Sequence, residues 1–105
     1  MVLSQVIFKA SEVTPLGALA FAPLIAEAGF PPGVINIVSG GAITGALLAK
    51  HMRVRLISFT GTIATGKKVQ ELAAQSNLKK AILELGGKSP ALVFDDTDIG
   101  KAVEA

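Results

Sequence analysis

The sequence predicts an α/β fold in which strands and helices alternate along one chain and the sheet is mostly parallel. Short runs of β-branched and aliphatic residues recur between longer stretches whose apolar residues have helical spacing. The predominantly apolar run Val34–Val38 is typical of strands buried on both faces of a parallel sheet. Alternation of this kind indicates βαβ units with right-handed crossovers.

The first strand is expected over Gln5–Lys9, which is rich in β-branched and aromatic residues. A helix should follow, with Thr14 as its N-cap, Pro15 at the first helical position and Gly29 as the stop signal. Pro23 lies inside this stretch and should kink the helix, because proline lacks the N–H that the helical ladder needs.

The remaining elements follow the same alternation. Val34–Val38 is expected to be the second strand. The glycine-containing stretch "SGGAITGALLAKH" should then form a turn followed by a second helix. Val54–Phe59 is the third strand, Ile63–Gln75 the third helix and Lys80–Leu85 the fourth strand.

A fifth strand is expected over Ala91–Phe94, after the glycine pair and Pro90, and Asp96 or Thr97 should cap a last helix. The chain ends in "KAVEA", in the middle of a helical pattern. We interpret residues 1–105 as one partial domain.

Composition excludes several classes of function. The chain of 105 residues contains no cysteine, so it has no disulfide, no thiolate metal site and no thiol nucleophile of its own. A net charge of +2 with five phenylalanines and no tyrosine or tryptophan does not predict a nucleic-acid surface. The longest apolar run, Leu16–Ala26, contains a proline and is too short to span a membrane. We expect a cytoplasmic protein with no nucleic-acid or membrane partner.

The stretch "FTGTIATGKK", residues 59–68, places glycines at 61 and 66 and a lysine at 67, as in a phosphate-binding P-loop. Lys68 stands where the P-loop hydroxyl that binds Mg²⁺ should be, which counts against that class. Gly61 would still permit close backbone approach at a helix start, and Thr62 could add a hydroxyl donor. The plainer alternative is an ordinary turn between a strand and a helix.

Glu84 interrupts an apolar strand and precedes two glycines, so it is a candidate general base whose charged form apolar neighbours would disfavour. The alternative is a solvent-facing glutamate that pairs with Lys80 or Lys88. Lys9 and Glu12 follow the first strand, where open α/β sheets place ligand contacts. No group of residues has the spacing of a metal site.

Four segments in order, "KASEVTPL" at 9–16, "EAGFPPGVINIVSG" at 27–40, "FTG" at 59–61 and "LELGGKSP" at 83–90, strongly resemble the NAD(P)⁺-dependent aldehyde dehydrogenases. The resemblance covers nearly the whole chain. It implies a Rossmann-like fold that is incomplete relative to the full family fold, with residues 86–105 leading toward the catalytic domain. It also implies an oxidoreductase that converts aldehydes to carboxylic acids.

The resemblance assigns coenzyme roles residue by residue. Gly61 and Thr62 match the turn that holds the coenzyme pyrophosphate in this family without a Walker lysine. Lys9 and Glu12 match positions that contact the adenosine ribose, and a glutamate there favours NAD⁺ over NADP⁺ by repelling a 2′-phosphate. Thr65 stands where an apolar residue commonly lines the adenine pocket.

The resemblance also assigns the catalytic positions. Glu84 matches the general base that activates the hydrolytic water, and the backbone around Leu85 lies near the nicotinamide in such enzymes. The family's cysteine nucleophile and oxyanion-holding asparagine have no counterparts in this chain, so we expect no dehydrogenase turnover from the chain alone. The alternatives are a non-catalytic dinucleotide-binding or assembly module and a P-loop nucleotide binder. The resemblance also implies a homo-oligomeric parent family, and we expect this chain to self-associate.

Overall fold

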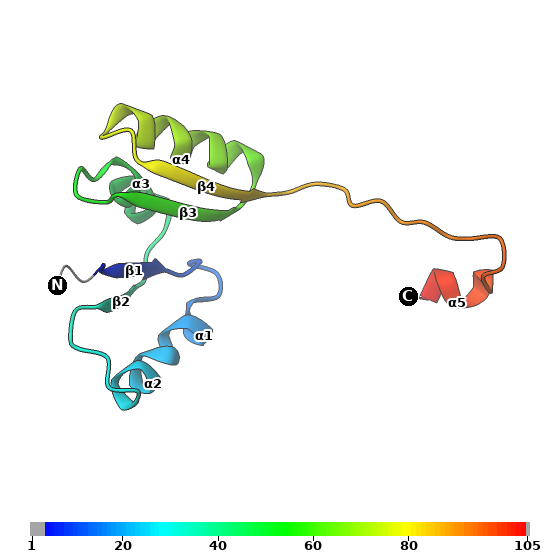
Figure 1. Cartoon of the computed structure of the whole chain (residues 1–105), viewed down its shortest axis with the longest axis horizontal. Coiled ribbons are helices and arrows are strands. Elements are labelled where there is room, and N and C mark those ends of the chain that lie inside the picture. Colours follow the sequence, from blue (N-terminus) through cyan, green and yellow to red (C-terminus); the bar gives the residue numbers. More distant parts are fainter. Residues whose placement is uncertain (1–3, 105) are drawn as a thin grey trace.

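The computed structural model describes residues 4–104 of the chain. Strands and helices alternate in nearly the predicted order (Figure 1). The strands are β1 (Val6–Lys9), β2 (Ile35–Val38), β3 (Leu56–Gly61) and β4 (Lys80–Leu85). The helices are α1 (Pro15–Leu19), α2 (Phe21–Glu27), α3 (Ala42–Lys50), α4 (Ile63–Gln75) and α5 (Ile99–Glu104).

All strand pairing in the described residues is parallel, as predicted, but it forms two separate sheets. β1 pairs with β2 from Val6 opposite Ile35 to Lys9 opposite Val38. β3 pairs with β4 from Leu56 opposite Lys80 to Gly61 opposite Leu85. The two pairs lie one above the other in Figure 1 and are joined by α3.

The single helix expected over residues 15–28 is wrong, because the structure divides it into α1 and α2 at Ala20. A continuous helix would bring the Pro23 ring against the carbonyl of Leu19. The break at Ala20 places Pro23 in the first turn of α2, where an N–H has no intrahelical acceptor in any case. Pro23 therefore lies in the first turn of a second helix instead of kinking a single long one.

The strand expected over Ala91–Phe94 is also wrong. The chain from residue 86 to residue 94 has no regular secondary structure and extends away from both sheets (Figure 1). A strand needs a hydrogen-bonded neighbour, and the described residues offer none here. The cap of the last helix is likewise neither Asp96 nor Thr97: Asp98 Oδ1 accepts the N–H groups of Gly100 (3.0 Å) and Lys101 (3.4 Å).

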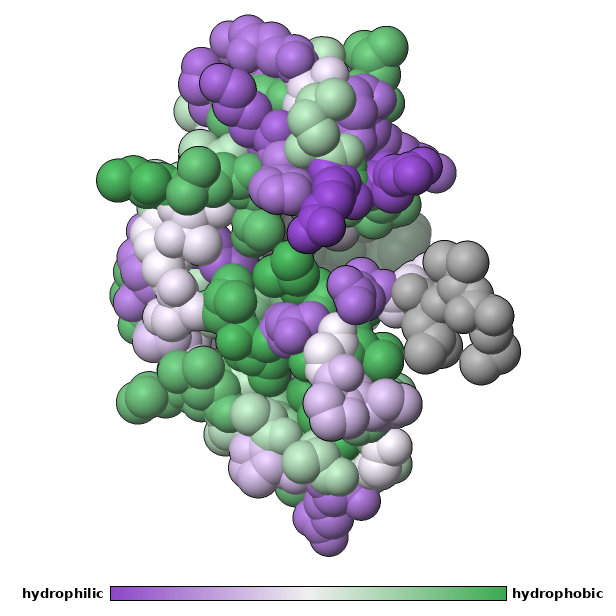
Figure 2. Space-filling model, turned by 90° about the vertical axis from the view of Figure 1, so that its left-hand side faces the viewer, coloured by the Kyte–Doolittle hydropathy of each residue, from purple (hydrophilic) through white to green (hydrophobic). Residues whose placement is uncertain are grey.

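The core is small. Helix α4 packs on one face of β3 and β4 and also contacts α3, while α1 contacts β2. On the β3–β4 face away from α4, alternate residues are exposed, including Leu56 and Ile82. Figure 2 shows hydrophobic residues at the surface across the middle of the molecule. Among the described residues no large side chain is fully buried.

Hydrogen bonds from the loop between α4 and β4 hold the end of α3 and the residues before β3 in position. Lys79 is buried, and its Nζ donates to the carbonyl of Ala49 in the last turn of α3 and to Ser76 Oγ, both at 2.5 Å. Asn77 Nδ2 donates to the carbonyls of Met52 (2.6 Å) and Val54 (3.0 Å), just before β3. The bond from Lys79 satisfies a carbonyl at the end of α3, and the bonds from Asn77 satisfy carbonyls in the loop between α3 and β3.

Candidate functional site

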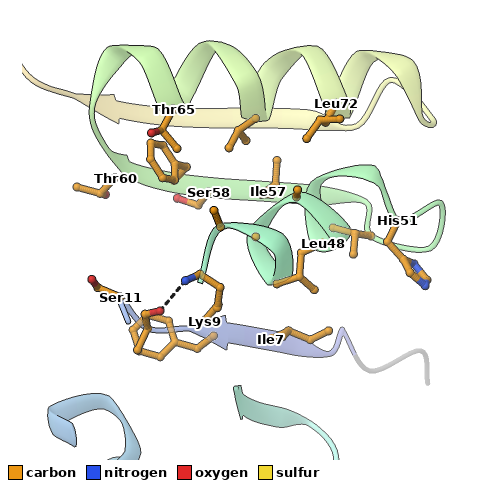
Figure 3. Close-up of a pocket in the computed structure, with 18 of the residues that line it drawn as sticks. Ile7, Lys9, Ser11, Leu48, His51, Ile57, Ser58, Thr60, Thr65 and Leu72 are labelled. Atoms are coloured by element: carbon orange, nitrogen blue, oxygen red, sulfur yellow. Dashed lines mark hydrogen bonds between the residues drawn. The ribbon is translucent and has the colours of Figure 1, made fainter. Parts of the chain in front are cut away.

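The candidate site lies in a groove between the two sheets, where the carboxyl ends of β1 and β3 meet. The groove is lined by residues of β1, β3, α3 and α4. Figure 3 shows the polar side chains of Lys9, Ser11, Ser58, Thr60 and Thr65 toward the carboxyl ends of β1 and β3, whereas His51 lies at the other end of the groove. From β1 the chain passes to β2, and from β3 it passes to β4 on the opposite side. The chain connections thus diverge on the two sides of the groove, as they do at the topological switch point where open α/β sheets bind ligands.

Lys9 and Glu12 lie close together at the end of β1, where the sequence analysis placed both residues. Lys9 Nζ donates to the carbonyls of Gly40 (2.6 Å) and Ala10 (2.8 Å) and lies 3.6 Å from a carboxylate oxygen of Glu12. The Glu12 side chain is more than half exposed, whereas that of Lys9 is mostly covered. Lys9 therefore holds the start of α3 and orients Glu12, whose carboxylate remains available to a ligand.

The turn between β3 and α4 consists of a single residue, Thr62. Thr62 Oγ1 accepts the N–H of Thr65 (3.3 Å) and also lies 3.0 Å from Thr65 Oγ1. As in any helix, the first-turn N–H groups of Ile63 and Ala64 have no acceptor within the helix. The amino end of this 13-residue helix thus offers free N–H donors and a positive dipole end beside the groove.

Gly61 is required at the end of β3 for a steric reason. Its φ is 159°, and a Cβ at this position would lie 2.6 Å from Cζ of Phe59. A real Cβ does not approach an aromatic ring so closely, so any side chain would push the ring or the turn aside. The absence of a side chain also leaves the backbone open to close approach by a ligand.

Glu84 lies in β4 directly opposite Thr60 of β3, so the ladder brings it to the same end of the sheet as the turn. Its side chain is exposed, so the desolvated setting that the sequence suggested is not present. Within residues 4–104 Glu84 forms no ion pair, so the pairing with Lys80 or Lys88 is not present either. Leu85 stands opposite Gly61 at the end of the ladder.

The P-loop alternative conflicts with the geometry. Gly66 and Lys67 lie inside α4, where its first turn passes into its second, instead of in a loop that wraps around a phosphate. Lys68, at the position of the P-loop hydroxyl, forms an exposed ion pair with Glu71 (2.9 Å). This pairing holds the pKa of the Glu71 carboxyl below its usual value.

Sequence reasoning missed the contribution of Ser58 to the groove. The only signal for it is that Ser58 and Thr60 alternate in β3 and so share one face. Among residues 4–104 there is no cluster of three or more His, Asp or Glu side chains that could hold a metal ion. None of the helices in this range has the length and apolar character needed to cross a membrane.

Comparison with known proteins points to one family. The model described as "Aldehyde dehydrogenase family" matches residues 4–105. An aldehyde dehydrogenase of Agaricus bisporus is 52% identical over 99 residues, which cover 93% of this chain and 20% of that protein. Cytosolic aldehyde dehydrogenase 1 of Rattus norvegicus is 55% identical over 102 residues, covering 96% of this chain and 20% of that protein. The chain thus spans a fifth of the length of these relatives.

Solved structures agree with the sequence comparison. The NAD-dependent aldehyde dehydrogenase from Sinorhizobium meliloti superposes with a TM-score of 0.86 at 40% identity, over 95% of this chain and 20% of that one. PnpE in complex with nicotinamide adenine dinucleotide gives a TM-score of 0.86 at 46% identity, with the same coverage. These likenesses confirm the predicted α/β, Rossmann-like fold with parallel strand pairs as part of a larger fold.

Proposed function

Because the chain belongs to the aldehyde dehydrogenase family, we propose that it is the coenzyme-binding segment of an NAD(P)-dependent oxidoreductase that converts aldehydes to carboxylic acids. The observation that carries the proposal is the convergence of Lys9, Glu12 and Thr62 in the groove between β1 and β3, with Gly61 directly before Thr62 at the end of β3. A bound coenzyme supplies the acceptor for the hydride that leaves the aldehyde carbon.

The pyrophosphate belongs at the amino end of α4. The free N–H groups of the first turn and the helix dipole favour an anion there, and Gly61 leaves room for it. The Thr62 hydroxyl bonds within the turn and keeps the first turn in register. Thr65, which also lines the groove, lies next to this position and is assigned to the adenine side.

Glu12 is the ribose-binding residue in this proposal. Its exposed carboxylate can accept hydrogen bonds from two ribose hydroxyls, and its negative charge disfavours a 2′-phosphate. Lys9 acts mainly by orienting Glu12 and the turn at Gly40, because its ammonium already serves those acceptors. We therefore assign NAD⁺ as the preferred coenzyme, with NADP⁺ as the weaker ligand.

Glu84 is the proposed general base. In that role it takes a proton from the water that hydrolyses the acyl-enzyme, and the Leu85 backbone borders the nicotinamide position. The chain has no cysteine, so the nucleophile that forms the acyl-enzyme must come from other polypeptide. The expected consequence is a chain that binds coenzyme but does not turn over aldehyde by itself. The compartment proposed for it is the cytoplasm.

The first experiment is calorimetric titration of the full chain with NAD⁺ and NADP⁺, with circular dichroism to follow folding. Saturable NAD⁺ binding is expected for the wild type and should be lost in Gly61→Val, because the new side chain meets the Phe59 ring and occupies the pyrophosphate approach. Gly17→Val is the matched control, since a Cβ at Gly17 meets no atom within 4 Å. A folded wild type that binds neither coenzyme would contradict the proposal.

The absence of cysteine also favours a second candidate, a non-catalytic dinucleotide-binding or assembly module. The two candidates differ in whether Glu84 has a role. If the chain, mixed with a polypeptide that supplies the nucleophile, restores aldehyde-dependent NADH formation and Glu84→Gln abolishes it, the enzyme segment is supported. Restoration that is insensitive to Glu84→Gln favours the module.

A further inference from the structure

Acidic residues are absent from the middle of the chain. Between Glu27 and Glu71 the sequence contains no aspartate or glutamate, but it contains five cations: Lys50, Arg53, Arg55, Lys67 and Lys68. Half of the eight acidic residues lie instead close to the carboxyl terminus, and these are Asp95, Asp96, Asp98 and Glu104. The chain therefore has a basic central part and an acidic carboxyl-terminal part.

Three of the cations lie at the amino ends of β3 and β4, the end of that sheet opposite to the candidate site. Arg53 and Arg55 precede β3, and Lys80, the first residue of β4, stands opposite Leu56 in the ladder. All three cationic residues are exposed. Neither of the two ion pairs found in residues 4–104 involves any of them. Their charges are thus available to an acidic partner.

Two exposed apolar side chains lie beside these cations. Met52 and Leu78 are 63% and 81% exposed, and Asn77 joins their loops by donating to the Met52 carbonyl (2.6 Å). In the upper half of Figure 2, which looks at this end of the sheet, hydrophilic and hydrophobic residues lie next to one another. We call this region the basic surface, and its members are Arg53, Arg55, Lys80, Met52 and Leu78.

The backbone of Leu78 adds an independent observation. Its φ is 55°, a left-handed conformation that glycine and asparagine adopt more readily than leucine. A leucine that is both exposed and held in this conformation contributes little to the packing of its own chain. An outlier of this kind on an exposed loop indicates a contact with another polypeptide.

The acidic part of the chain forms an arm, residues 86–104. The arm leaves the carboxyl end of β4 and projects away from both sheets (Figure 1). Its apolar side chains are uncovered, since Phe94, Ile99 and Val103 are 71%, 72% and 81% exposed. Ile99 and Val103 are four residues apart in α5 and therefore share one face of that helix.

The charges of the arm lie next to these apolar residues. Asp98 caps α5 by accepting the N–H groups of Gly100 and Lys101. Asp95 and Asp96 directly follow Phe94 in the sequence and are exposed. The arm thus offers two carboxylates beside an apolar face, whereas the basic surface offers cations beside two apolar side chains.

We propose that the basic surface binds the acidic arm of a second copy of this chain. Asp95 and Asp96 lie beside Arg53 and Arg55 in this contact, and the apolar face of α5 covers Leu78. Because the arm leaves the sheet at the end opposite to the basic surface, it points toward a neighbouring molecule and away from its own basic surface (Figure 1). Exchange of an identical segment between copies is a low-cost route to association.

The test is a charge exchange in the full chain, followed by sedimentation velocity over a range of concentrations. The arm variant is Asp95→Arg/Asp96→Arg, and the surface variant is Arg53→Glu/Arg55→Glu. Each variant places like charges opposite one another, so self-association should weaken about tenfold or more. An equimolar mixture of the two variants pairs opposite charges again in both contacts and should restore association, which also shows that both variants are folded.

Two further variants separate the contact from general effects of charge and folding. Lys67→Glu/Lys68→Glu changes the net charge as much as the surface variant does but lies in α4, outside the basic surface, and should leave association unchanged. Leu78→Asn should weaken association about tenfold, because it removes the apolar contact. Its free energy of unfolding in urea should not fall, because asparagine suits the left-handed conformation.

The proposal is overturned by a wild type that stays monomeric at every concentration. It is also overturned if the surface variant associates as strongly as the wild type, if the mixture associates no better than its components, or if the lysine control weakens association equally. A monomer that becomes more extended in the arm variant at every concentration would show that the arm folds back on its own chain. None of these substitutions replaces a residue of the proposed coenzyme site, so coenzyme titration remains a separate test of the proposed function.

Discussion

At the scale of the residue, the exposed carboxylate of Glu12 is the group that should distinguish the two coenzymes. Glu12→Gln removes the charge that repels a 2′-phosphate but keeps an oxygen that accepts a ribose hydrogen bond. We expect the affinity for NADP⁺ relative to NAD⁺ to rise roughly fivefold, which corresponds to about 1 kcal/mol for two charges near 4 Å in water. Parallel calorimetric titrations measure this ratio.

Glu104→Gln in α5 is the control for the change in net charge, and it should leave the ratio unchanged. An unaltered ratio in Glu12→Gln would show that the carboxylate does not face the ribose.

Lys79 and Lys80 are adjacent identical residues, yet only Lys79 is buried. Lys79→Met should lower the free energy of unfolding by about 1 to 3 kcal/mol, because it leaves the Ala49 carbonyl without its charged donor. Lys80→Met is the matched control and should change it by less than about 0.5 kcal/mol. Urea unfolding of the three proteins measures both differences, and equal effects would contradict the assigned role of Lys79.

The same lysine predicts a pH dependence. Burial lowers the pKa of Lys79 from its ordinary value of 10.5. Between the lowered pKa of the folded state and 10.5, the unfolded chain binds more protons than the folded chain, so stability rises with pH in that window. The free energy of unfolding of the wild type should therefore rise relative to Lys79→Met as pH approaches 10.5. A difference that falls over this range would contradict the burial of the charged group.

At the scale of the element, α4 is seated on β4 through Gly66. A Cβ at Gly66 would lie 2.6 Å from Cδ2 of Leu85. Replacing glycine by alanine inside a helix stabilises the folded state by about 1 kcal/mol, but overpacking the contact with Leu85 destabilises it by roughly 1 to 3 kcal/mol. Gly66→Ala should therefore destabilise the wild type and stabilise the Leu85→Ala background. Urea unfolding of the four proteins of this double-mutant cycle tests the change of sign, and the same sign in both backgrounds would contradict the contact.

Element boundaries show how far local sequence signals reach. The strand Lys80–Leu85 and the helix Ile63–Gln75 have the predicted bounds. Their periodicity and the Thr62 cap depend only on residues that are close together in the sequence. The sequence predicts that Pro23 disrupts the helix, but it does not predict the residue at which the helix breaks. A break at Ala20 depends on the backbone geometry that keeps the proline ring away from the Leu19 carbonyl. Ala91–Phe94 has strand composition but no partner, and pairing is not a local property.

At the scale of the whole molecule, the described chain is far from compact. Its radius of gyration is 18.9 Å, against about 13 Å for a compact domain of this length. Val103 and Phe94, 81% and 71% exposed, are among the apolar side chains left uncovered. We expect the isolated chain to self-associate, because such surface and the unpaired strand edges of both sheets favour contact with other chains.

Sedimentation velocity over a range of protein concentrations measures this association. Species larger than a monomer that increase with concentration are expected. A monodisperse, fully folded monomer with a sharp thermal transition would contradict the expectation.

The sequence by itself determined the family, the α/β alternation, the parallel pairing and the positions of Lys9, Glu12, Gly61, Thr62 and Glu84, because motifs and periodicity are properties of neighbouring residues. Only the tertiary structure decided that pairing stops at two separate sheets, that Glu84 is exposed and that Lys79 is buried beside α3. The physical reason is that burial and strand partners depend on which distant segments meet, and a groove between β1 and β3 exists only once both are placed.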